Sequence, residues 1–67
     1  MTNTRLFREY ISSSGYKLGA VASAAGLTYQ GFINKMNNDN EFKASEIKAI
    51  SAYTHMPDTT RDAIFFA

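Results

Sequence analysis

Few side chains in this chain could take part in catalysis or bind a metal. Its 67 residues include no Cys and one His, which excludes thiolate chemistry and argues against the zinc sites that Cys and His build. The sequence shows no paired carboxylates, no nucleophile beside a base and no phosphate-binding glycine loop. It therefore predicts a protein that binds a partner and is not an enzyme, with no metal and no cofactor.

The charged residues are distributed unevenly along the chain. The part up to Asn38 has a net charge of +3, from four cations and one acid, and the part after it has −2, from three cations and five acids. The chain as a whole carries only +1. A basic face and an acidic face would explain this asymmetry, and scattered surface charges would explain it equally well.

Apolar residues recur at helical spacing in five short stretches, and no stretch alternates as a strand would. We expect helices at about residues 4–13, 18–25, 29–36 and 44–54, and a last one that begins at residue 58 or 59. Gly, Asn and Pro separate these stretches, and they favour turns over helix interiors. The sequence predicts one all-α domain over residues 1–67, a compact arrangement of five helices.

The block Leu18–Met36 combines a short helix, a glycine turn and a second helix with polar residues along one side. Small residues such as Ala22 allow two helices to cross closely, Gly26 permits the sharp turn, and Thr28 is a good N-cap. This pattern, at about residues 18–36, is typical of a helix-turn-helix, whose second helix presents its first residues outward.

The same block resembles the helix-turn-helix of the XRE/Cro/CI-like phage repressors. It has Ala22 at the small position of the first helix, Gly26 four residues later and Leu27 directly after. The segments Glu41–Ile50 and Ala63–Ala67 resemble the same subgroup of small phage and prophage regulators. The resemblance covers nearly the whole chain and implies a compact five-helix, lambda-repressor-like DNA-binding domain.

The resemblance also implies which residues would touch DNA. The second helix of the block would enter the major groove, and its base contacts would come from Thr28, Tyr29, Gln30 and Asn34. Contacts to phosphates, which position a protein without reading sequence, would come from Lys17, Lys35, Asn37, Asn38 and Lys43. A close approach to DNA would also explain Gly31, because glycine is unfavourable in an exposed helix.

Two positions depart from the family pattern. Leu18 stands where the family usually has Gln, and Lys17 stands where a Ser or Thr cap is common. Lys17 is therefore expected to supply a phosphate contact in place of the Gln. Lys43 stands where a capping Thr often begins the fourth helix, and Glu46 is expected to help at that helix start.

Some of these residues have a structural interpretation beside the functional one. Tyr29 could be an exposed ring or a partner contact, and Lys43 could be a solvated charge at a helix start. His55 is expected at a helix end or on the surface. Phe65 and Phe66 are expected to close the core against the first helix, or to form a dimer contact.

The leading prediction is a sequence-specific DNA-binding transcriptional regulator, similar to a phage Cro-type repressor. It would bind a pseudo-palindromic double-stranded operator as a homodimer, formed before binding or on the DNA. The alternative is a modulator or antirepressor that binds a partner phage repressor, which the low net charge and the missing Gln at Leu18 favour. An antitoxin is a third hypothesis. The chain has no Cys, no signal sequence and no membrane-length apolar stretch, which favours the bacterial cytoplasm, at the nucleoid.

Overall fold

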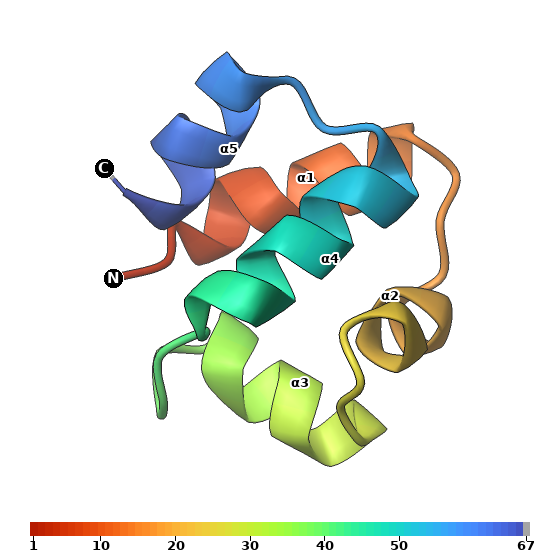
Figure 1. The fold of residues 1–67 in the computed structure, drawn as a ribbon, viewed down its shortest axis with the longest axis vertical. Helices are drawn as coiled ribbons and strands as arrows, with labels where there is room; N and C mark the ends of the chain where they lie inside the picture. The colour runs from red at the N-terminus through yellow and green to blue at the C-terminus, as the bar shows by residue number, and fades with distance from the viewer. Residues whose placement is uncertain (67) are drawn as a thin grey trace.

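The computed structural model describes residues 1–66, which form five α-helices and no strand. The helices are α1 (Thr4–Ser13), α2 (Leu18–Ala24), α3 (Tyr29–Met36), α4 (Ala44–Thr54) and α5 (Asp58–Phe65) (Figure 1). The predicted all-α fold is confirmed, and α2 ends one residue earlier than expected. None of these five helices is long and apolar enough to cross a membrane.

Side chains that accept backbone N–H groups fix the starts of three helices. The Oδ1 atom of Asn3 accepts from the Leu6 N–H at 3.2 Å and caps α1. The Oγ1 atom of Thr28 caps α3, as expected. At α4, Glu46 Oε1 accepts from the Lys43 N–H at 2.8 Å, which confirms the role expected for this carboxylate.

Residues with left-handed backbone conformations end helices and reverse the chain. Gly26 has a φ of +75° and leads into the connection to α3, where the Leu27 N–H donates to the Ala22 carbonyl at 3.0 Å. Asn38 (φ +68°) and His55 (φ +55°) take similar conformations without being glycine. His55 ends α4, as expected for a residue at a helix end.

The hydrophobic core is centred on the ring of Phe7 in α1. This ring makes edge-to-face contacts with Phe32 of α3, Phe42 of the α3–α4 connection and Phe65 of α5, at centroid distances of 5.9, 5.9 and 5.1 Å. The four rings therefore hold four separate segments together. The other buried apolar side chains are Ile11, Val21, Ala22, Met36, Ile47, Ile50, Met56 and Ile64.

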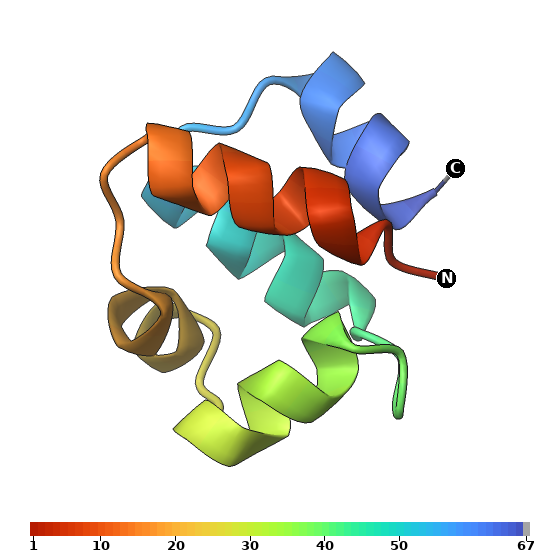
Figure 2. The same ribbon diagram turned by 180° about the vertical axis from the view of Figure 1, so that it is seen from behind.

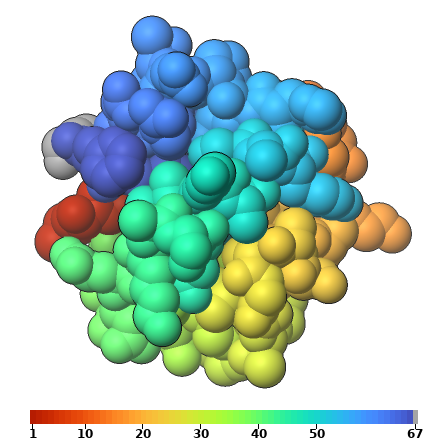
Figure 3. Space-filling view, in the orientation of Figure 1, coloured from red at the N-terminus to blue at the C-terminus, as the bar shows by residue number. Residues whose placement is uncertain are grey.

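The arrangement of the helices leaves α3 at one edge of the molecule. Helices α1 and α5 pack together on the opposite side, where the Asn3 N–H donates to the Ile64 carbonyl at 2.7 Å (Figure 2). Helix α4 lies between that pair and α3 in both views. It packs against α2, which in turn packs against α3. In the space-filling view the side chains around α3 form the lower edge (Figure 3). This edge is therefore accessible to a partner.

Candidate functional site

Helix α3 has one apolar side and one polar side. Its Phe32 and Met36 side chains are fully buried in the core. The predicted base-contacting residues lie away from that core: Thr28, Tyr29 and Gln30 are exposed, and Asn34 is half-buried. The apolar side anchors the helix in the core, and the polar side and the start of the helix face solvent. The fold thus gathers the four residues at the outer side of α3.

The cap of α3 gives Gly31 a role within the protein. The Gly31 N–H donates to Thr28 Oγ1 at 3.1 Å. A Cβ atom added at Gly31 would lie 3.0 Å from that same oxygen, which is closer than ordinary van der Waals contact. A close approach to DNA is therefore not needed to explain this glycine. The Thr28 hydroxyl already accepts one hydrogen bond and keeps its own proton to donate.

Gln30 and Asn34 contact each other directly. The Nε2 atom of Gln30 donates to Oδ1 of Asn34 at 2.8 Å, across one turn of α3. This contact was not predicted from the sequence, although a spacing of four residues in a helix brings two amide side chains within reach. It orders two of the four predicted base-contacting side chains relative to each other.

Lys35 is held in an ion pair and is not a free cation. Its Nζ atom donates to both carboxylate oxygens of Glu46, at 2.7 and 2.9 Å, and the two side chains are 14% and 10% exposed. Burial alone would raise the pKa of Glu46, but the hydrogen bonds from Lys35 and from the Lys43 backbone lower it below the ordinary value. A phosphate contact by Lys35 would have to break this pair.

Asn38 is committed to the N-terminal segment. Its Oδ1 atom accepts from the Thr2 N–H at 2.7 Å, and its Nδ2 atom donates to the Thr2 carbonyl at 2.9 Å. The Nδ2 atom also lies 3.4 Å from Thr4 Oγ1, so a phosphate contact by this amide would compete with that hydrogen bond. Asn38 therefore fixes the end of α3 against residue 2, a role that the sequence did not indicate.

The other residues expected to contact phosphates remain accessible. Lys17, Asn37 and Lys43 are exposed, and neither lysine forms an ion pair within residues 1–66. Lys17 precedes α2 and Lys43 precedes α4, the two helices that adjoin α3 in Figure 1. The candidate site therefore consists of the polar start of α3, with one accessible lysine directly before α2 and another between the end of α3 and α4.

Aromatic residues at the C-terminal end of the described chain divide between core and surface. Phe65 is 6% exposed and packs on Phe7, whereas Phe66 is 63% exposed. Of the two interpretations of Phe66, closure of the core and a dimer contact at the surface, only a surface contact agrees with this exposure.

Comparisons of the chain with protein-family models, with curated proteins and with solved structures found no match. The assignment of a function therefore rests on the residues and contacts described above.

Proposed function

We propose that this protein is a DNA-binding transcriptional regulator that reads operator DNA with α3, in the manner of the phage repressors that its sequence resembles. The observation that carries the proposal is the polar, exposed start of α3 on a helix whose other side is locked into the core. Helices α2 and α3, joined through the left-handed Gly26, would then act as a helix-turn-helix. The side-chain amides of Gln30 and Asn34 suit the major-groove edge of adenine.

Few cations support this interface, and that determines its salt dependence. Lys35 is paired with Glu46, so of the three lysines expected to contact phosphates, Lys17 and Lys43 remain accessible. Two phosphate contacts per copy, four in a dimer, correspond to a slope of about −4 in a plot of log affinity against log salt. We expect roughly a 100-fold loss of dimer affinity between about 50 and 200 mM salt.

Binding as a homodimer would compensate for this small number of contacts. The longest dimension of the domain, between Cα atoms, is 26 Å. One copy therefore fits within one turn of DNA, and half-sites about 34 Å apart would each receive one copy. The protein would then act in the bacterial cytoplasm, at the nucleoid, by binding and without catalysis or a cofactor.

The test is selection of bound sequences from a random double-stranded DNA pool, followed by gel shifts. We expect Gln30→Ala and Asn34→Ala each to weaken binding of the selected site at least about tenfold, since a good base contact is worth about 1–3 kcal/mol. Thr59→Ala is the matched control, because Thr59 is also exposed but lies on α5, away from α3. Unchanged affinity for both α3 variants would show that this is not the reading face.

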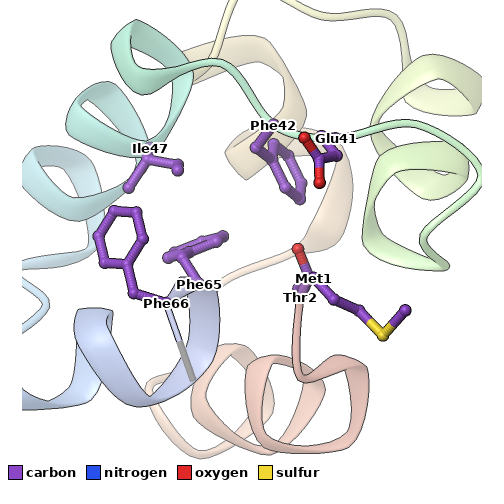
Figure 4. Close-up of a pocket in the computed structure, with 7 residues that line it drawn as sticks. All are labelled: Met1, Thr2, Glu41, Phe42, Ile47, Phe65 and Phe66. Atoms are coloured by element: carbon purple, nitrogen blue, oxygen red, sulfur yellow. The ribbon is translucent and has the colours of Figure 1, made fainter.

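A second function, as a modulator that binds a partner repressor, is favoured by the surface around Phe66. A cavity of about 370 Å³ opens there (Figure 4), lined by Met1, Thr2, Glu41, Phe42, Ile47, Phe65 and Phe66. An exposed ring beside a partly apolar cavity is a common feature of protein interfaces. Co-purification with a repressor encoded next to this gene, abolished by Phe66→Ser, together with no DNA shift by this protein alone, would favour this function.

A further inference from the structure

We infer that the face around Phe66 is the surface through which two copies of this chain associate. This inference deepens the proposed function and rests on it for the homodimer, to which it assigns a surface. Met1 and Phe66 have the highest exposed fractions among the large apolar side chains of residues 1–66, 84% and 63%. Both line the cavity of about 370 Å³ in Figure 4. An exposed apolar patch on a small domain favours contact with another protein.

A second cavity shares Phe66 and Ile47 with the first. Its volume is about 360 Å³, and its lining comes from α4 and α5: Ala44, Ile47, Lys48, Ser51, Arg61 and Phe66. Because Phe66 and Ile47 line both cavities, they form the centre of the face, with a cavity on each side. A ring between two cavities can enter a cavity of a second copy while the ring of that copy enters one of its own.

Opposite charges flank this apolar centre. Glu41 lines the first cavity and Lys48 lines the second, and both residues are exposed. Neither forms an ion pair within residues 1–66. Arg61 also lines the second cavity, but its guanidinium already pairs with Asp58 and Asp62 at 3.2 and 2.9 Å. Among the described residues, Lys48 is therefore the cation on that flank that is available to a partner.

A second copy of the chain matches this charge pattern. A two-fold axis through the centre of the face exchanges its two flanks, so that Glu41 of each copy lies opposite Lys48 of the other. Both ion pairs then form at the rim of the apolar contact, where charges select the partner and its orientation. A different protein would need its own acid and base at matching positions. The order of acid, apolar centre and base is self-complementary, and we therefore assign the face to a second copy.

The position of this face agrees with the reading of DNA by α3. Helices α4 and α5 lie side by side in Figure 3, whereas the side chains around α3 form the lower edge. A second copy seated on α4 and α5 leaves the polar start of α3 uncovered. A standard interface of about 800 Å² per partner would take one fifth of the 4018 Å² surface of this domain. Because the face covers only part of two helices, we expect a weak dimer in the free protein, with a Kd of about 100 µM.

The experiment is sedimentation equilibrium without DNA, at low salt and at up to about 1 mM protein. We expect the unmodified protein to approach a dimer as its concentration rises. Phe66→Ser should weaken the association at least about tenfold, since the ring lies at the centre of the contact. Glu41→Lys and Lys48→Glu should each weaken it about tenfold, because each places two like-charge pairs in the dimer.

An equimolar mixture of the two charge variants tests the pairing between copies. One variant carries two cations on the face and the other carries two acids, so a mixed dimer regains both ion pairs. We expect the mixture to associate about tenfold more tightly than either variant alone. Arg8→Glu is the matched control, because Arg8 is an exposed cation on α1 that lines neither cavity. It changes the net charge as Lys48→Glu does, but it should associate like the unmodified protein, and its mixture with Glu41→Lys should gain clearly less.

Three results would overturn this inference: a monomer at every concentration, association that Phe66→Ser leaves unchanged, or a mixture of the charge variants no tighter than its components. A monomer that binds a neighbouring repressor through Phe66 would overturn it in favour of the second function. A protein that dimerises as expected but selects no DNA sequence would overturn the proposed function and leave this surface as a self-association face. Helical circular dichroism of each variant shows that folding is retained.

Discussion

Replacing Glu46 by Gln removes one charge from the ion pair that joins α3 to α4. The carboxylate accepts two hydrogen bonds from Lys35 Nζ, at 2.7 and 2.9 Å, and one from the Lys43 N–H at 2.8 Å. A Gln side chain can accept through one oxygen only. The Lys35 ammonium, with a side chain that is 14% exposed, would then have no anion beside it.

The size of the effect follows from how deeply the pair is buried. Removing one partner of a buried ion pair costs about 3–5 kcal/mol, because an uncompensated charge stays behind. Exposed pairs are worth about 0–1 kcal/mol. The side chains here are 14% and 10% exposed, which is close to the buried limit, but a lysine can extend toward water. We expect a loss of about 2–3 kcal/mol, which lowers the Tm of a domain of this size by roughly 10–20 °C.

The ion pair also makes stability depend on pH in the acid range. The pKa of Glu46 is lowered in the folded protein, because its hydrogen bonds outweigh the opposing effect of burial. Its stabilisation is therefore fully present above the ordinary carboxyl pKa of 4.5 and is lost as the pH falls through the lowered folded value. Between neutral and acid pH, the unmodified protein should lose more stability than Glu46→Gln.

Thermal unfolding followed by circular dichroism measures both effects. Glu41→Gln is the matched control, because it makes the same substitution at an exposed carboxylate with no ion pair within residues 1–66. A decrease in Tm of less than about 3 °C for Glu46→Gln, or one equal to that of the control, would refute the reasoning. An equal loss of stability in the unmodified protein and in Glu46→Gln as the pH falls would also refute the reasoning.

Three further predictions concern the stability of the fold. Phe65→Ala should lower the free energy of unfolding by about 3–5 kcal/mol, whereas Phe66→Ala should change it by less than about 0.5 kcal/mol; urea titrations that gave equal losses would contradict the burial of Phe65. His55→Gly should raise stability by about 1 kcal/mol, since the residue has a φ of +55°, and a lower Tm would mean that the imidazole contributes a contact. Ser51→Ala should stabilise the protein by about 1 kcal/mol, because the buried hydroxyl has no hydrogen-bond partner among residues 1–66, and a clear loss of stability in urea unfolding would show that it is hydrogen-bonded.

The helix boundaries could be predicted because the signals that set them are local. Thr28 caps α3 through an N–H only three residues away. Gly26 takes its left-handed conformation at the chain reversal between two helices, and His55 ends α4 next to a Met-Pro sequence. Each of these positions can be recognised from its immediate neighbours, which is why the expected and observed elements agree.

The contacts of the candidate site could not be predicted in the same way. Lys35 and Glu46 come from different helices, and Asn38 bonds to Thr2 across 36 positions of sequence. Residue type alone shows a lysine and an asparagine near a helix end, and a resemblance to DNA-binding proteins makes both look available for phosphates. Only the packing of α3 against α4 and against the N-terminal segment shows that their polar atoms are already bonded.

The cluster of phenylalanines has a consequence for how the molecule opens. Phe7 contacts three rings, and one of them, Phe42, belongs to the connection between α3 and α4. Separating α1, α3 or α5 from the rest would expose part of the same cluster to water. These helices should therefore exchange their amide hydrogens together, at a rate set by global unfolding. Helices α2 and α4 contribute no ring to this cluster, so the protection of their amides should depend instead on the packing of α2 against α3 and α4.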